Sequence, residues 1–222
     1  MPQRTQIVGT GANSGIEGQV DLTHLATRTS IRPIDYGTGG GFSISLQSGV
    51  MAAGLAAGSP ILAFQWTVSA AVALIRRLRL TAGTDTTAFA QGSTIFDVIR
   101  ATAFTVQDTG GVAVTIGAGQ KRATKFGTSL VGNAGIRVSS TAALVAGTRT
   151  LDPNPMASLV GSVGAVPLTL ASPPPGLLWE ENPGRYPLNL IQSEGFIIRA
   201  TVPATGTWKF AIDIDWEEVA SF

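Results

Sequence analysis

The sequence lacks cysteine and holds a single histidine, His24. Without cysteine the chain can form no disulfide, no thiolate zinc site and no thiol nucleophile. A serine–histidine–aspartate triad would need His24 as its base, and no GxSxG nucleophile motif accompanies that residue. We therefore interpret His24 as an ordinary surface or interface histidine. We expect the protein to be no enzyme, with no catalytic, cofactor-binding or metal-binding residues.

Charge is also scarce, because charged residues make up 13% of the chain, against roughly 25% in an average soluble domain. A surface of small neutral residues suits a protein that neighbouring subunits cover, although it also fits a secreted β protein. The net charge of +1 creates no large positive field, so we expect no specific nucleic-acid partner. The densest basic cluster, residues 120–125, is weak evidence for a phosphate site, and we expect a solvated loop there.

Long apolar runs are absent as well. The most apolar stretch, residues 50–64, is interrupted by Gly54, Gly58 and Pro60, and it is shorter than the ~20 residues that a membrane-spanning helix needs. Residues 1–9 lack the basic-then-apolar order of an export signal. We therefore expect no transmembrane segment, no cleaved signal and no membrane partner.

The strongest pattern that is present lies near the C-terminus. Across residues 207–219, Trp208, Ile212 and Trp216 belong to an apolar set that alternates with charged or small residues. Successive side chains of a strand point to opposite faces, so the pattern predicts a strand with one buried face. Residues 194–202 predict another strand, and with residues 203–206 as the turn the two strands are expected to form a β-hairpin.

Similar apolar, branched and aromatic runs occur upstream, at residues 41–48, 61–68, 72–82, 93–106, 111–118 and 136–147. Around eight strands without alternating helices predict an all-β fold, an antiparallel β-sandwich or jelly roll. Trp66, Trp208 and Trp216 fall on the apolar strand faces and are expected in the core. Helix is expected only in short pieces, near residues 16–27 or 141–145.

Two regions do not fit a plain sandwich. Residues 1–40 are rich in glycine and threonine and are expected to form an extended N-terminal arm, while residues 41–222 form a single domain. Within that domain, residues 152–187 hold eight of the twelve prolines, and proline cannot sit in a central strand. We therefore expect a long Pro-rich excursion, with a polyproline II piece at residues 172–176. Trp179 is expected to anchor this excursion, either to its own domain or to a neighbouring subunit.

A glycine motif at residues 9–15 is similar to the TGxxxGIG pattern of short-chain dehydrogenases. A dinucleotide site needs a strand before the glycines and a long helix after them, and the surrounding sequence supplies neither. Glu17 replaces the last glycine of the pattern, and neither Tyr36 nor Tyr186 is followed four residues later by lysine. We therefore interpret the match as accidental and expect no cofactor.

A row of carboxylates, Asp213, Asp215 and Glu217, lies on the polar face of the last predicted strand. Such a row can bind a cation or perform acid–base chemistry. It more often faces solvent or pairs with cations of a neighbouring strand. We expect solvation or ion pairing, with three arginines of other predicted strands as the partners: Arg77, Arg79 and Arg100.

Several stretches together resemble a family of tailed-bacteriophage virion proteins: residues 73–80, 96–111, 127–159, 186–202 and the Asp-Trp pair at 215–216. The resemblance covers residues 60–218 and not the arm. It implies a structural protein of the virion, assembled in the host cytoplasm, most simply a capsid cement or decoration protein. The implied partners are the major capsid protein and copies of the chain itself, with a trimer as one option.

Three interpretations follow. The leading one is a non-enzymatic subunit that stabilises a phage shell through subunit–subunit contacts. The second is a tail or fibre adhesin that binds a host glycan or surface protein. The third, and least favoured, is an enzyme with a dinucleotide site at residues 9–15.

Overall fold

The computed structural model describes residues 20–21, 26–27, 40–52, 54–88, 90–117, 120, 127–132, 135–163, 176–181 and 187–220. The chain divides into two compact units, Met1–Ile34 and Asp35–Phe222. In the first unit, β1 (Val20–Asp21) pairs antiparallel with β2 (Ala26–Thr27), so the helix expected in residues 16–27 is wrong for the described part of that range. His24, the glycine motif at 9–15 and most of the basic cluster at 120–125 lie outside the described residues.

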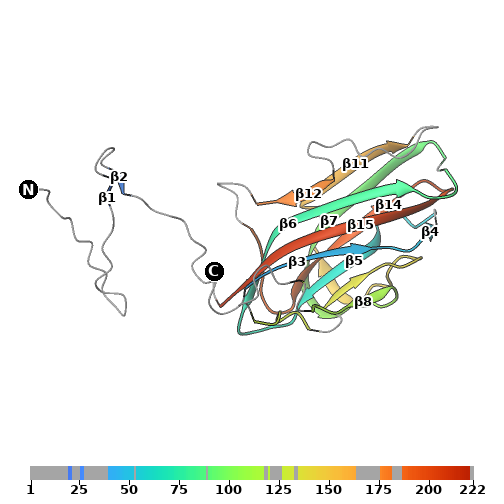
Figure 1. The fold of residues 1–222 in the computed structure, drawn as a ribbon. Helices are drawn as coiled ribbons and strands as arrows, with labels where there is room; N and C mark the ends of the chain where they lie inside the picture. The colour runs from blue at the N-terminus through green and yellow to red at the C-terminus, as the bar shows by residue number, and fades with distance from the viewer. Residues whose placement is uncertain are drawn as a thin grey trace, which may run out of the picture. The chain divides into compact units, whose positions relative to one another are not determined.

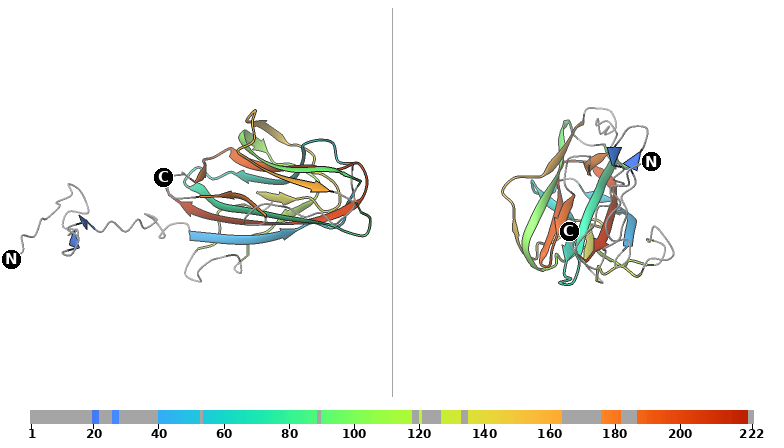
Figure 2. Two further views of the ribbon diagram at one scale, coloured as in Figure 1. Left: turned by 90° about the horizontal axis from the view of Figure 1, so that it is seen from above. Right: turned by 90° about the vertical axis from the view of Figure 1, so that its left-hand side faces the viewer.

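The second unit consists of two antiparallel sheets packed face to face, which confirms the predicted all-β sandwich (Figures 1 and 2). The first sheet has the order β10 (Thr148–Leu151), β7 (Gly92–Val106), β14 (Glu194–Thr201), β5 (Ser59–Trp66), β9 (Ile136–Val138) and β8 (Val112–Val114), with β11 (Ala157–Val163) also paired to β7. The second sheet has the order β12 (Leu177–Glu180), β6 (Val72–Thr84), β15 (Thr207–Val219) and β3 (Gly40–Gln47), with β13 (Leu188–Leu190) beside β6 and β4 (Met51–Ala52) beside β15.

The strands pair in a nested order, in which the first strand of the sandwich pairs with the last. Strand β3 pairs with β15, β5 with β14, β6 with β12 and β13, and β7 with β10 and β11. This first-with-last order is the connectivity of a jelly roll, so the predicted fold holds at the level of topology too. Strands β8 and β9 lie between β7 and β10 in sequence and extend the first sheet beyond β5.

The hairpin expected from β14 and β15 is wrong, because the two strands lie in different sheets. Strand β14 is flanked by β5 and β7, whereas β15 is flanked by β3 and β6. Both strands therefore have a hydrogen-bonded neighbour on each side. The short connection at residues 203–206 passes from one sheet to the other. The alternation of apolar residues indicates which face of a strand is buried but not which strand lies beside it.

Aromatic side chains from both sheets meet in the core between them. Trp66, Trp208 and Trp216 are fully buried, as predicted. Trp216 contacts Phe64 of the opposite sheet edge to face, with ring centroids 6.0 Å apart. The indole N–H groups of Trp66 and Trp208 donate to backbone carbonyls at 2.9 and 3.3 Å, so burying these tryptophans leaves no donor of theirs unpaired.

The outer face of the first sheet carries a second, smaller cluster in which Leu144 packs with Ile99, Phe104 and Ile197. The strand predicted at residues 136–147 therefore ends at Val138, and the helix expected at 141–145 does not form. Instead, the Leu144 N–H donates to the Pro60 carbonyl at 2.8 Å, and the chain crosses the sheet. This cover explains why β14 is apolar on both faces rather than alternating.

The Pro-rich excursion expected at residues 152–187 contains regular structure, so that prediction needs correction. Strands β11 and β12 both lie inside it. Each is an edge strand that pairs with one neighbour, and edge strands tolerate nearby proline because their outer N–H groups pair with nothing. The expected polyproline II piece falls almost wholly outside the described residues.

Candidate functional site

A hollow of the described surface lies where the two sheets present their edges on the same side. Strands β10 and β11 form one interrupted edge along β7, and strands β12 and β13 form another along β6. Strands β11 and β12 lie next to each other. The break in the first edge covers residues 152–156, which include Pro153 and Pro155. The break in the second edge lies between the end of β12 at Glu180 and the start of β13 at Leu188.

The ends of the breaks are tied down by backbone hydrogen bonds. The Asp152 N–H donates to the Arg100 carbonyl at 3.0 Å, and the Met156 N–H donates to the Val98 carbonyl at 2.8 Å. On the facing edge, the Glu181 N–H donates to the Arg76 carbonyl at 2.9 Å. These hydrogen bonds hold Asp152 and Met156 against β7 and hold Glu181 against β6.

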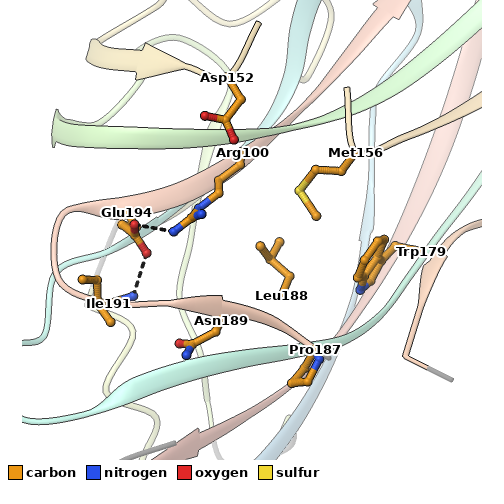
Figure 3. Close-up of a pocket in the computed structure, with 9 residues that line it drawn as sticks. All are labelled: Arg100, Asp152, Met156, Trp179, Pro187, Leu188, Asn189, Ile191 and Glu194. Atoms are coloured by element: carbon orange, nitrogen blue, oxygen red, sulfur yellow. Dashed lines mark hydrogen bonds and ion pairs between the residues drawn. The ribbon is translucent and has the colours of Figure 1, made fainter. Parts of the chain in front are cut away.

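A cavity of about 440 Å³ lies at the breaks and is called the lateral groove below (Figure 3). Its lining combines charged, amide, aliphatic and aromatic side chains. The lining residues are Arg100, Asp152, Met156, Trp179, Pro187, Leu188, Asn189, Ile191 and Glu194.

One end of the lateral groove is polar. Arg100 donates from Nη2 to Glu194 Oε1 at 2.5 Å, and the Ile191 N–H donates to Glu194 Oε2 at 3.1 Å. The Glu194 N–H in turn donates to the Ile191 carbonyl at 3.0 Å, across a turn in which Ser193 has a positive φ of 63°. The tight turn before β14 therefore fixes the carboxylate, and the carboxylate fixes the guanidinium.

The other end of the lateral groove is apolar. Figure 3 shows Trp179 at this end, with Leu188 and Met156 between it and the Arg100–Glu194 pair. Trp179 and Met156 are partly buried and pack against the main core. Trp179 belongs to β12, where it pairs with Leu78. Trp179 therefore contacts its own domain, and a contact with a neighbouring subunit stays a prediction.

Two acceptors in the lateral groove are not engaged by the described residues. Asn189 Oδ1 is buried and has no hydrogen-bond partner among them. The Asp152 side chain is half-buried, and no described residue donates a hydrogen bond to its carboxylate. Of the two, the Asp152 carboxylate lines the cavity on a residue that is partly exposed, so it can accept a hydrogen bond from a ligand or water.

The predicted ion pairing of the acidic row is confirmed for Asp215, which meets Arg77 at 2.6 Å. Asp213 stands opposite Arg79 in the register of β15 and β6. Arg100 is not a partner of this row, because it lies in the other sheet and binds Glu194.

Glu217 pairs with Arg76 at 2.7 Å, because a register shift after Asp215 moves the rest of the strand by one position. Arg76 also pairs with Glu181. Burial alone would lower the pKa of Arg76, but its hydrogen bonds to Glu217 and Glu181 raise that pKa above its ordinary value. The described residues contain no group of three His, Cys, Asp or Glu that could hold a metal ion.

Three buried charged side chains, in two arrangements, were not predicted from the sequence. Asp108 forms an ion pair with Arg149 that is almost fully buried, and burial lowers the pKa of Arg149. Glu218 is fully buried and accepts hydrogen bonds from Leu130 N–H at 2.8 Å and Trp216 Nε1 at 3.0 Å. The partners lie far apart in the chain or follow the shift after Asp215, so no periodicity pointed to them. Both arrangements connect loops to the sandwich.

No helix among the described residues is long and apolar enough to cross a membrane. Comparison with protein-family models, with curated proteins and with solved structures found no match to this chain.

Proposed function

We propose that the protein is a structural subunit of a tailed-phage particle, a capsid cement or decoration protein that binds the major capsid protein and copies of itself. One observation carries the proposal most directly: the chain divides into a jelly-roll body and a separate N-terminal unit, Met1–Ile34. The sequence resemblance over residues 60–218 supports the same assignment. Jelly rolls occur in viral capsid proteins and in lectins, which is an analogy at the level of fold.

The N-terminal unit is ill suited to stand alone. Residues 1–34 contain no Phe, Trp, Tyr or Cys. Segments below about 40 residues rarely build a sufficient core without disulfides, metals or association with another chain. A neighbouring subunit would supply the missing contact area, which makes this unit the first candidate for a lattice contact.

The charged side chains of the described ion pairs have their partners within the body itself. The described ion pairs connect neighbouring strands or a strand and a loop: Arg76–Glu181, Arg76–Glu217, Arg77–Asp215, Arg100–Glu194, Arg149–Asp108, Arg199–Asp97 and Lys209–Asp85. On the edge strand β3, the exposed side chains are Ser43, Ser45 and Gln47. A surface of small neutral groups can be covered by a neighbour without desolvating unpaired charge, which favours a packed subunit.

Immunogold labelling of purified particles tests this proposal. An antibody is raised against the recombinant chain, and the particles are imaged by electron microscopy. The proposal expects gold over the capsid surface. Gold confined to tails would support the adhesin function instead. Unlabelled particles that carry a detectable control antigen would reject both the capsid and the adhesin function.

The adhesin is the second candidate function because the lateral groove has the mixture of polar and aromatic groups that recognition sites use. The third candidate function is an enzyme with a dinucleotide site at residues 9–15. Titration of NADH or NADPH fluorescence with the full chain tests it, since binding at residues 9–15 would change the emission of the cofactor.

A further inference from the structure

We propose that the lateral groove binds a neutral saccharide, with a sugar ring against Trp179 and hydroxyl groups on Asp152, Asn189 and the Arg100–Glu194 pair. This inference does not rest on where the protein sits in a particle. It follows from the size of the groove, from its single accessible indole and from the mixture of hydrogen-bonding groups that line it.

The size fits a small ligand. The cavity of about 440 Å³ falls within the range of roughly 300–1,000 Å³ that is usual for small-molecule sites. It lies near the lower end of that range, which favours one or two sugar residues over a long chain. The groove is open at the side of the sandwich, so the rest of a larger glycan could extend into solvent.

The aromatic wall is supplied by one side chain. All four tryptophans are among the described residues, and three of them, Trp66, Trp208 and Trp216, are fully buried. Trp179 alone is partly exposed, and it lines the groove. An indole offers a broad apolar face on which the C–H face of a sugar ring can lie. Leu188 and Met156 extend this apolar wall toward the polar end.

The polar end offers acceptors and donors together. The Asp152 carboxylate can accept hydrogen bonds, the Asn189 amide lines the groove, and Arg100 retains N–H groups beyond the one that it gives to Glu194. A hydroxyl group both donates and accepts, so a polyol satisfies both kinds of group at once.

The charged side chains of the groove lining disfavour both anionic and cationic ligands. The lining carries two carboxylates and one guanidinium, and Arg100 is already neutralised by Glu194 at 2.5 Å. An anionic ligand would meet the unpaired carboxylate of Asp152, and a cationic one would compete with Arg100 for Glu194. Addition of a peptide as a further strand is disfavoured too, because the N–H groups of Asp152, Met156 and Glu181 already donate to carbonyls of β7 and β6.

The test begins with the full chain on an array of neutral and acidic glycans. Neutral glycans that are retained are then titrated in solution as the free oligosaccharides, with calorimetry to measure affinity in every variant and tryptophan emission to detect a ligand beside Trp179. Because the other three tryptophans are fully buried, a ligand in the groove should change the emission of Trp179. The expected result is saturable binding of at least one neutral saccharide, with a change in emission that is absent from Trp179→Ala.

Variants separate the groove from other surfaces. Asp152→Ala should weaken binding at least about tenfold, the loss expected for removing a charged acceptor. Its fold should persist, since no described residue donates to that carboxylate. The matched control, Asp213→Ala on the opposite sheet, should bind as the unmodified chain does. Melting temperatures identify any variant that has unfolded.

Three outcomes would overturn the inference. The first is an array on which no neutral glycan is retained. The second is retention of acidic glycans alone. The third is a neutral saccharide that binds Asp152→Ala and Trp179→Ala, both folded, as tightly as the unmodified chain.

Discussion

Gly195 approaches the backbone of Phe64 so closely that a Cβ atom on Gly195 would lie 2.1 Å from the Phe64 carbonyl oxygen. The neighbour is backbone in the middle of a sheet, so it cannot move aside. Gly195→Ala should therefore destabilise the protein by about 1–3 kcal/mol or more, as overpacking does. Urea unfolding measures the loss. Gly83→Ala is the matched control, because a Cβ there meets nothing within 4 Å, and it should change stability little.

The buried ion pair of Asp108 and Arg149 predicts a large effect of a single substitution. The side chains are 0% and 5% exposed, and the guanidinium carbon lies 5.4 Å from the centre of the Phe104 ring. Arg149→Met leaves a buried charge unpaired and should cost about 3–5 kcal/mol.

The double variant, Asp108→Asn with Arg149→Met, is the control for this pair. It removes both charges and should recover much of the loss, because a buried pair replaced by neutral groups is often tolerated. Urea unfolding of the two variants decides the matter. Equal losses in the single and the double variant would show that packing, and not charge, is what the pair supplies.

A third prediction concerns pH. The hydrogen bond from Lys209, whose Nζ lies 3.0 Å from Asp85 Oδ1, holds the pKa of the Asp85 carboxyl below its ordinary value. A depressed pKa stabilises the fold above the unfolded-state pKa, and that stabilisation is lost as the pH falls through the lowered pKa.

Lys209→Met should move the titration midpoint of Asp85 upward, as measured by NMR of its carboxyl carbon. The variant should be less stable than the unmodified chain at neutral pH, and the two stabilities should converge in acid. An unchanged midpoint would show that Lys209 does not act on Asp85.

Much of the sandwich could be predicted because the buried face of a strand follows from the alternation of side chains along a short segment. From Trp208 to Trp216, large apolar residues alternate with charged or small ones, and the structure buries the large apolar side chains as this alternation predicts. The predicted pairing of β14 with β15 was wrong. Strands β14 and β15 follow each other closely yet lie in different sheets, because each already has two neighbours that come from earlier in the chain.

The lateral groove could not be predicted for a related reason. Its lining comes from residues as far apart in the sequence as Arg100 and Glu194, which the pairing of β7 with β14 brings together. The prolines of residues 152–187 predict an irregular excursion and do not reveal the strands inside it. In the structure, Pro153 and Pro155 lie between the edge strands β10 and β11.

The arm supplies a prediction about assembly. A chain that begins at Asp35 should keep the melting temperature of the jelly-roll body, because the body forms a separate compact unit. The same chain should lose most of its association with particles. Calorimetry and sedimentation with added particles measure the two effects, and loss of folding in the truncated chain would show that the arm belongs to the core.

The most direct test of the structural function is density-gradient fractionation of a native phage lysate, with an antibody to this chain. The account predicts that the chain comigrates with intact phage and with capsids that lack tails. Signal only in tail fractions would contradict the capsid assignment and favour the adhesin. Signal only at the top of the gradient, as free protein, would contradict the structural role altogether.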